Sequence, residues 1–146
     1  MRGRLLPPTY LNAFLVLAIG LHFILPIRRI IYAPYTNLGF VFVLLAVYIN
    51  IWAVRQLRKN NTTIDFHGTP NELTTNGPFR ISRNPIYLSG VLLSLGIAIL
   101  LGSLITFVFP IALLLILDRF YIPSEEVVLE KTFGKQYLEC IEKVRR

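Results

Sequence analysis

Four apolar stretches dominate the pattern of hydrophobic and polar positions along the chain. They cover about residues 10–25, 38–54, 85–101 and 104–117. Each approaches the ~20 residues that a helix needs to cross a ~30 Å hydrocarbon core. The two residues between the last two stretches, Gly102-Ser103, form a link short enough to force an antiparallel hairpin. The pattern predicts an all-α, polytopic membrane protein with about four transmembrane helices.

Two polar segments complete the predicted single domain, which covers residues 1–146. The first is a loop over about residues 56–84, rich in Asn, Thr, Gly and Pro, and the second is a tail over residues 118–146. In the tail, Pro123 suits a first helical turn and Gly134 interrupts the helix. The apolar positions of the tail recur every four residues and predict one stripe that packs on the membrane domain: Leu129, Phe133, Tyr137 and Ile141.

Composition agrees with a membrane protein and excludes several other classes. The chain is 54% hydrophobic and 16% charged, whereas a soluble domain carries about 25% charged residues. Its net charge of +7 does not indicate a nucleic-acid partner, because the basic residues flank the apolar stretches. The single cysteine, Cys140, excludes an internal disulfide, and His67 has no second ligand at metal-binding spacing. We therefore expect no bound metal.

The distribution of Lys and Arg predicts the topology. With four crossings, thirteen of these residues fall on the face shared by the N-terminus, the loop and the tail, and only Arg28 and Arg29 fall on the other face. The positive face is the cytoplasmic one. We expect a multi-pass integral membrane protein, of the kind found in bacterial inner membranes, with both termini in the cytoplasm.

Ionisable residues are almost absent from the apolar stretches. His22 is the exception, and Asn50 is its main strongly polar companion. Transporters and proton channels place charges near the midplane of the membrane, so this pattern argues against both classes. A lone His22 is typical of a side chain that is hydrogen-bonded inside the bundle.

The first segment with candidate chemistry covers residues 75–90. In it, Gly77-Pro78 predicts a turn, Arg80 and Arg83 lie just outside the bilayer, and Asn84-Pro85 opens the third helix. Exposed N–H groups at a helix start bind anions, and guanidinium groups assist them. The alternative is that both arginines only contact lipid headgroups at the membrane boundary.

The second segment covers residues 124–137. Glu126 and Glu130 are one helical turn apart and share a face. Carboxylates next to a lipid surface that attracts basic groups require a specific reason. The alternative is a solvated helix start, where Glu125 and Glu126 are stabilised by the helix dipole.

Together, the two segments resemble the isoprenylcysteine carboxyl methyltransferase family and, more broadly, the membrane phospholipid methyltransferases. The resemblance extends over about residues 73–137. The family pattern is Gly-Pro-Tyr/Phe, Arg-His/Asn-Pro-x-Tyr-x-Gly, a hydrophobic hairpin, and Glu-Glu-x-x-Leu-x-x-x-Phe-Gly-x-x-Tyr. The matching residues are Gly77-Pro78-Phe79, Arg83-Asn84-Pro85-Ile86-Tyr87, Glu125-Glu126, Leu129, Phe133-Gly134 and Tyr137. Many members have His in place of Asn84, and a bacterial-type subgroup shares the Ser-Arg-Asn-Pro of this chain.

The resemblance implies an enzyme that uses S-adenosylmethionine at the cytosolic edge of the helices and methylates a lipid-borne acceptor. It implies that Arg83 or Asn84 binds the carboxylate of the cofactor, and that Glu125 and Glu126 accept hydrogen bonds from its ribose or ammonium. Tyr87 would line the adenine or sulfonium, where a ring face attracts positive charge. The expected cofactor-binding set is Arg83, Asn84, Pro85, Tyr87, Leu88, Glu125 and Glu126.

Catalytic roles follow from the acceptor. Methyl transfer requires alignment and a dry site more than a nucleophilic side chain. Arg80 would orient a carboxylate acceptor, and Glu130 would act as a base for an amine or thiol or lie on the surface. The acceptor is a prenylated thiol or carboxylate, a phospholipid amine, or a small amphiphile. The alternatives are a phospholipid N-methyltransferase, a sterol-type NADPH-dependent reductase, and a non-enzymatic membrane assembly factor.

Overall fold

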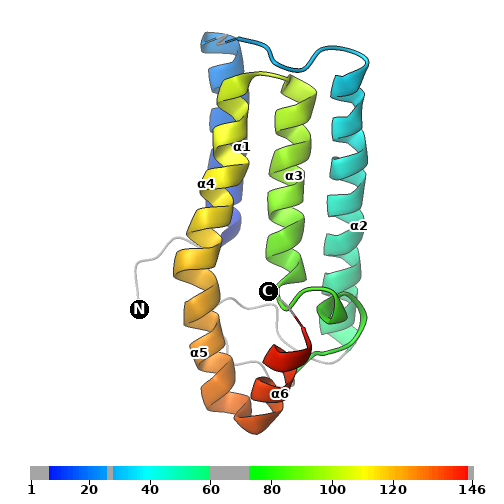
Figure 1. Cartoon of the computed structure of the whole chain (residues 1–146), viewed down its shortest axis with the longest axis vertical. Coiled ribbons are helices and arrows are strands. Elements are labelled where there is room, and N and C mark those ends of the chain that lie inside the picture. Colours follow the sequence, from blue (N-terminus) through cyan, green and yellow to red (C-terminus); the bar gives the residue numbers. More distant parts are fainter. Residues whose placement is uncertain (1–6, 26–27, 60–72, 145–146) are drawn as a thin grey trace.

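The computed structural model describes residues 7–25, 28–59 and 73–144 and has an all-α fold (Figure 1). Within these ranges the chain has no strand, and only an isolated bridge joins Arg29 and Ser103. The prediction of an all-α fold is therefore confirmed. The helices are α1 (Pro7–Ile24), α2 (Leu38–Lys59), α3 (Pro85–Leu101), α4 (Val108–Ile116), α5 (Ile122–Phe133) and α6 (Lys135–Lys143), with short helical turns η1 (Tyr35–Asn37), η2 (Gly77–Arg80), η3 (Leu104–Phe107) and η4 (Leu117–Tyr121).

Small residues set the close packing of α2 against α3. On α2, Gly39, Ala46 and Ala53 are all buried and recur every seven residues, so they share one face of the helix. A Cβ added to Gly96 of α3 would lie 2.9 Å from the backbone oxygen of Gly39. Small side chains permit this approach of two helix backbones. This close packing against α2 fixes the position of α3, including its start.

The helical rod that contains the fourth apolar stretch continues past Leu117. Here, α4 continues through the π-helical turn η4 into α5, and Figure 1 shows one continuous rod. Pro123 explains the π turn, because a proline inside a helix lacks an N–H and its ring crowds the carbonyl four residues earlier, here that of Arg119. A local π widening accommodates both effects without a break. The first part of the predicted tail, residues 118–133, therefore extends the same rod.

The rod ends at Gly134, where the chain turns. This residue has φ +51° and ψ −121°, a conformation that residues with a side chain rarely adopt. The expected apolar stripe is consequently divided between α5 and α6: Tyr137 is buried, whereas Ile141 is exposed. Figure 1 shows that α6 turns back from the end of α5.

Hydrogen bonds close the opposite end of the bundle. His22 of α1 lies with its Nδ1 2.6 Å from Oγ of Ser103, and both side chains are buried. The backbone N–H of Ile30 donates to the oxygen of Gly102 at 2.8 Å, and that of Leu104 donates to the oxygen of Arg28 at 3.2 Å. The connection between α1 and α2 is thereby tied to the α3–α4 hairpin. His22 has the internal hydrogen bond expected from the sequence.

The surface of the bundle is rich in exposed apolar side chains. Large aliphatic and aromatic residues are exposed on α1, α2 and α4, as in Phe23, Leu44 and Ile111. Exposed apolar surface of this extent is typical of contact with lipid. The helical stretches Tyr35–Lys59 and Leu104–Phe133 are long and apolar enough to cross a membrane, and the apolar helices Pro8–Ile24 and Pro85–Leu101 are shorter. These helices are compatible with a membrane protein, and the number of crossings stays a prediction.

Several sequence predictions concern residues outside the described ranges. They are the basic residues of the two ends of the chain and the central part of the polar loop, and they include Arg2, Arg4, His67, Arg145 and Arg146.

Candidate functional site

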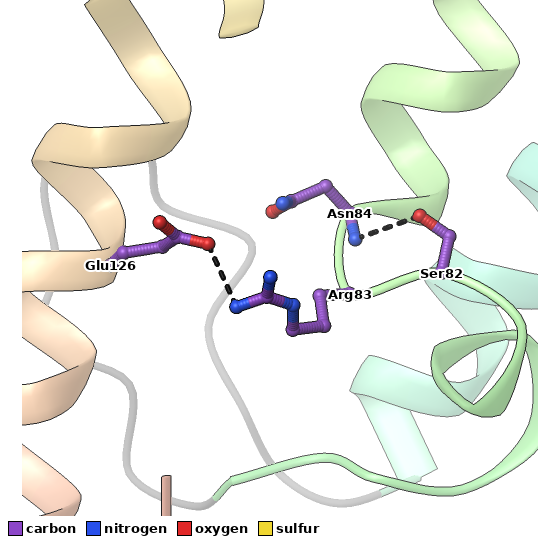
Figure 2. Close-up of polar contacts among 4 residues, drawn as sticks. All are labelled: Ser82, Arg83, Asn84 and Glu126. Atoms are coloured by element: carbon purple, nitrogen blue, oxygen red, sulfur yellow. Dashed lines mark hydrogen bonds and ion pairs between the residues drawn. The ribbon is translucent and has the colours of Figure 1, made fainter. Parts of the chain in front are cut away.

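An ion pair joins the two motif segments at one end of the bundle. Nη1 of Arg83, which directly precedes α3, lies 2.9 Å from Oε1 of Glu126 on α5 (Figure 2). The two side chains are 13% and 16% exposed. Water screens such a pair less than an exposed one, so its geometry is better defined than that of a surface salt bridge. Segments separated by the α3–α4 hairpin therefore meet at this pair.

The turn before α3 fixes the position of Arg83. Gly77 has φ +65° and lies against the side chains of Trp52 and Gln56 on α2. The backbone N–H of Ser82 donates to the oxygen of Pro78 at 3.2 Å, and its buried hydroxyl accepts from the N–H of Asn84 at 3.2 Å. These two hydrogen bonds fix the backbone on both sides of Arg83. The side chain of Arg83 therefore extends from a well-ordered backbone.

The start of α3 presents an amide next to the ion pair. Asn84 is the N-cap residue of α3, but its side chain makes no capping hydrogen bond, and Pro85 opens the helix as a buried first residue. Figure 2 shows the Asn84 side chain extending from the start of α3 toward α5, beside Arg83. The amide is thereby oriented toward the same space as the guanidinium.

A second contact between α3 and α5 lies one turn further along α3. The hydroxyl of Tyr87 donates a hydrogen bond to Oε1 of Glu125. Tyr87 is buried in a core cluster with Leu113, Leu117 and Ile122. Its hydroxyl therefore ties the two helices together, while its ring contributes to the core.

Tyr137 of α6 lies next to these residues. It is 3% exposed, and the charged groups near it are those of Arg83 and Glu126. Burial raises the pKa of Tyr137 above its usual value, and the nearby Glu126 carboxylate raises this pKa further, whereas Arg83 opposes the shift. The phenol is therefore neutral throughout the physiological pH range.

One buried donor of the site has no partner. Nε of Arg83 is inaccessible to solvent and makes no hydrogen bond to the part of the chain that the structure describes. An unsatisfied buried donor costs about 1–3 kcal/mol, so native structures rarely retain one without a reason. An acceptor group supplied by a ligand would satisfy it.

Three residues of the predicted site lie apart from these contacts. Arg80 is exposed on η2, Glu130 is exposed on α5 one turn beyond Glu126, and Leu88 is partly exposed on α3. Sequence reasoning gave no role to two residues that the structure places in the site, Ser82 and Tyr137. The tyrosine was signalled only as the last position of the Phe-Gly-x-x-Tyr motif, and the serine by its place next to Arg83.

Comparison with known proteins identifies one related family. The model of the family described as phospholipid methyltransferase matches residues 35–136, which is more than half of the chain. The match contains η2, α3, the hairpin and α5, and it ends one residue before Tyr137. No curated protein and no solved structure matches the chain. Among the residues described, no group of three or more His, Cys, Asp or Glu is placed to hold a metal ion.

Proposed function

Because this chain belongs to the phospholipid methyltransferase family, we propose that it transfers a methyl group from S-adenosylmethionine to a lipid-borne or amphiphilic acceptor. The observation that carries this proposal is the partly buried ion pair between Arg83 and Glu126, which joins the two motifs across a hydrophobic hairpin. The exposed apolar surface of the bundle supports a lipid environment for the reaction.

The residues of the site fit the charged end of the cofactor. The methionyl end of S-adenosylmethionine is a zwitterion, with a carboxylate and an ammonium on the same carbon atom. Arg83 and Glu126 offer the complementary charges, and the free Nε of Arg83 and the amide of Asn84 offer donors for the carboxylate. When the ligand binds, Arg83 can pair with the ligand carboxylate and Glu126 with the ligand ammonium. No charge is then left unpaired.

The remaining residues suit the rest of the cofactor. The Glu125 and Glu126 carboxylates can accept hydrogen bonds from ribose hydroxyls, and the ring of Tyr87 can face positive charge. Pro85 and Leu88 would supply apolar contacts at the start of α3. The hydrogen bond between Tyr87 and Glu125 supports this arrangement, because it fixes the side chains of both residues.

When bound, S-adenosylmethionine supplies an electrophilic methyl group on a sulfonium. The protein contributes orientation and the exclusion of water, which together account for much of the acceleration of a displacement reaction. We propose that Arg80, exposed on η2, orients an anionic group of the acceptor. For an amine or thiol acceptor, we propose that Glu130 accepts the proton that leaves the attacking atom.

The acceptor and the membrane arrangement belong to the same proposal. The description of the matched family favours the amine of a phospholipid headgroup, and the motif pattern of the isoprenylcysteine enzymes favours a prenylated carboxylate as the second candidate. We propose four membrane crossings with both termini in the cytoplasm, which is the arrangement that the positions of Lys and Arg predict. The acceptor would then enter sideways from the bilayer, while the cofactor enters from the cytoplasm.

Transfer of labelled methyl groups tests the proposal. Purified protein in detergent is incubated with methyl-labelled S-adenosylmethionine and a total lipid extract, and the labelled product is identified. We expect a labelled lipid, and its chemical class distinguishes the two acceptors. Thermal stabilisation by S-adenosylhomocysteine, and not by NADPH, should accompany it, because a ligand that binds only the folded state stabilises that state. Stabilisation by NADPH alone would indicate a reductase, and the absence of both a product and a thermal shift would favour an assembly factor.

A further inference from the structure

We propose that the outward face of α2, at the C-terminal end of this helix, binds a phospholipid with a net negative headgroup. This basic–aromatic face consists of an aromatic and apolar part followed by a basic part: Tyr48, Ile51, Trp52, Arg55, Arg58 and Lys59. The inference goes beyond the proposed methyl transfer and does not depend on it. An anionic lipid without an amine, such as phosphatidylglycerol, cannot be an amine acceptor, so the face is a second lipid site.

The spacing of these residues places them on the side of α2 that faces away from α3. The first four are spaced i, i+3, i+4 and i+7, so they share one face of the helix. Arg55 follows the buried Ala46 by nine residues, which is about two and a half helical turns. Figure 1 shows α2 at the edge of the bundle beside α3. Accordingly, Tyr48 is 61% exposed and Ile51 is 45% exposed.

A groove of about 300 Å³ lies on this face, lined by Tyr48, Ile51, Trp52 and Arg55. The ring centroids of Tyr48 and Trp52 are 5.8 Å apart, and the two rings are inclined by 44°. The turn η2 packs against the indole of Trp52, since a Cβ added to Gly77 would lie only 3.3 Å from its Nε1. The groove therefore has a supported aromatic wall with a cation beside it.

The positive charges of this face are unpaired among the described residues. Arg55, Arg58 and Lys59 are all exposed, and none of them forms an ion pair with the described part of the chain. In the sequence, no acidic residue precedes Asp65. Each basic residue near a membrane surface strengthens binding to anionic lipid by about fivefold. The face has no carboxylate to pair with a headgroup ammonium, so an anionic headgroup complements it better than a zwitterionic one.

The order of the residues along α2 follows the layers of one membrane leaflet. At a rise of about 1.5 Å per residue, Ile51, Arg55 and Lys59 succeed one another in steps of about 6 Å. The apolar side chain suits the acyl chains, the aromatic pair suits the membrane interface, and the basic side chains suit the level of the phosphates. A soluble anion would need only the charges. The groove beside them, continuous with the exposed apolar surface of α2, fits a lipid.

Trp52 is the only tryptophan of the chain, so its fluorescence reports on this groove. The full-length protein is reconstituted into phosphatidylcholine vesicles with increasing fractions of phosphatidylglycerol whose brominated acyl chains quench indole on contact. A parallel series contains brominated phosphatidylcholine. We expect phosphatidylglycerol to bind next to Trp52 at least about fivefold more strongly than phosphatidylcholine, and this preference to decrease at high salt.

The test variant is Arg55→Gln, and the matched control is Arg29→Gln, which removes an exposed charge from the connection between α1 and α2. We expect the preference for phosphatidylglycerol to fall about fivefold in Arg55→Gln and to stay unchanged in Arg29→Gln. Equal quenching by the two lipids in the wild type would overturn the inference, as would an unchanged preference in Arg55→Gln. Weak quenching by both lipids would also overturn it, because the face would then be covered by protein, such as a second copy of this chain.

Discussion

At the scale of single residues, the ion pair between Arg83 and Glu126 raises the question of why a partly buried charge pair is kept. Removing two charges from water costs free energy that their mutual attraction only partly returns, so an apolar pair of equal volume would serve stability as well. A site that must bind a zwitterion has a different requirement. It needs one fixed charge of each sign in contact, and Arg83 and Glu126 at 2.9 Å meet it.

The first prediction at this scale concerns Glu126→Ala. The variant leaves the cofactor ammonium without a carboxylate and Arg83 without its partner, so we expect affinity for S-adenosylhomocysteine to fall about tenfold or more. Glu139→Ala, which removes an exposed carboxylate on α6, should bind normally. Calorimetric titration measures both, and membrane fractionation verifies that both variants insert. Equal affinities of the two variants would exclude Glu126 from the cofactor site.

A second prediction concerns the contact between Tyr87 and Glu125. Tyr87→Phe leaves the Glu125 carboxyl without the donor that it has in the structure. Because this side chain is partly buried, we expect a loss of about 1–3 kcal/mol in the free energy of unfolding. Reversible denaturation in mixed micelles measures the loss, with the exposed Tyr48→Phe as the control. A variant as stable as the wild type would show that the hydroxyl does not tie the two helices together.

At the scale of elements, the sequence predicts the helices whose ends carry strong local signals. The bounds of α3 agree with the prediction, because Pro85 starts the helix and Gly102 adopts φ +67° just after its end. Pro123 suits a first helical turn and so predicted the start of a separate tail helix, whereas in the structure it lies just after a π turn inside a continuous rod. Whether a proline breaks a helix or widens it depends on the packing around it, which the local sequence does not contain.

The packing of elements was equally hidden in the sequence. The row formed by Gly39, Ala46 and Ala53 is inconspicuous among larger apolar residues, yet all three residues are buried, and Gly39 lies close to the backbone of α3. In the site, too, some features could be predicted from the sequence and others depend on packing. Its motif residues could be identified from their order and spacing, but the burial of Tyr137 depends on the reversal at Gly134. Periodicity alone instead predicted one continuous apolar stripe through that position.

The reversal at Gly134 gives the prediction at this scale. Gly134→Ala forces a side chain into a conformation that costs about 1–3 kcal/mol, so we expect α6 to leave its position and the affinity for S-adenosylhomocysteine to fall. Gly20→Ala in α1 is a matched control. At both positions an added Cβ meets no atom within 4 Å, but of these two glycines only Gly134 has a positive φ. Circular dichroism should show unchanged helix content in both variants. Wild-type affinity in Gly134→Ala would mean that the position of α6 does not matter for binding.

At the scale of the whole molecule, the two ends of the bundle differ in their chemistry. One end has the ion pair, the carboxyl groups and the basic residues that end α2, such as Arg58 and Lys59. The other end is closed by His22, Ser103 and the backbone hydrogen bonds of the two connections. Between them lies the exposed apolar surface of α1, α2 and α4. This polarity is what a membrane protein with a cofactor site on one face requires.

The last prediction is that these ends lie on opposite sides of the membrane, with α6 in the cytoplasm. The only cysteine of the chain, Cys140, is free on α6, so Cys140→Ser gives a background without thiols. In this background, Gln136→Cys places an exposed thiol on α6, and Tyr32→Cys places one in the exposed connection between α1 and α2. Because positively charged segments are retained in the cytoplasm, a membrane-impermeant maleimide should label Gln136→Cys only in inside-out vesicles and Tyr32→Cys only in right-side-out vesicles. The reverse pattern would mean an inverted orientation with the site facing outward, and labelling of both positions from one side would show that the bundle does not cross the membrane as proposed.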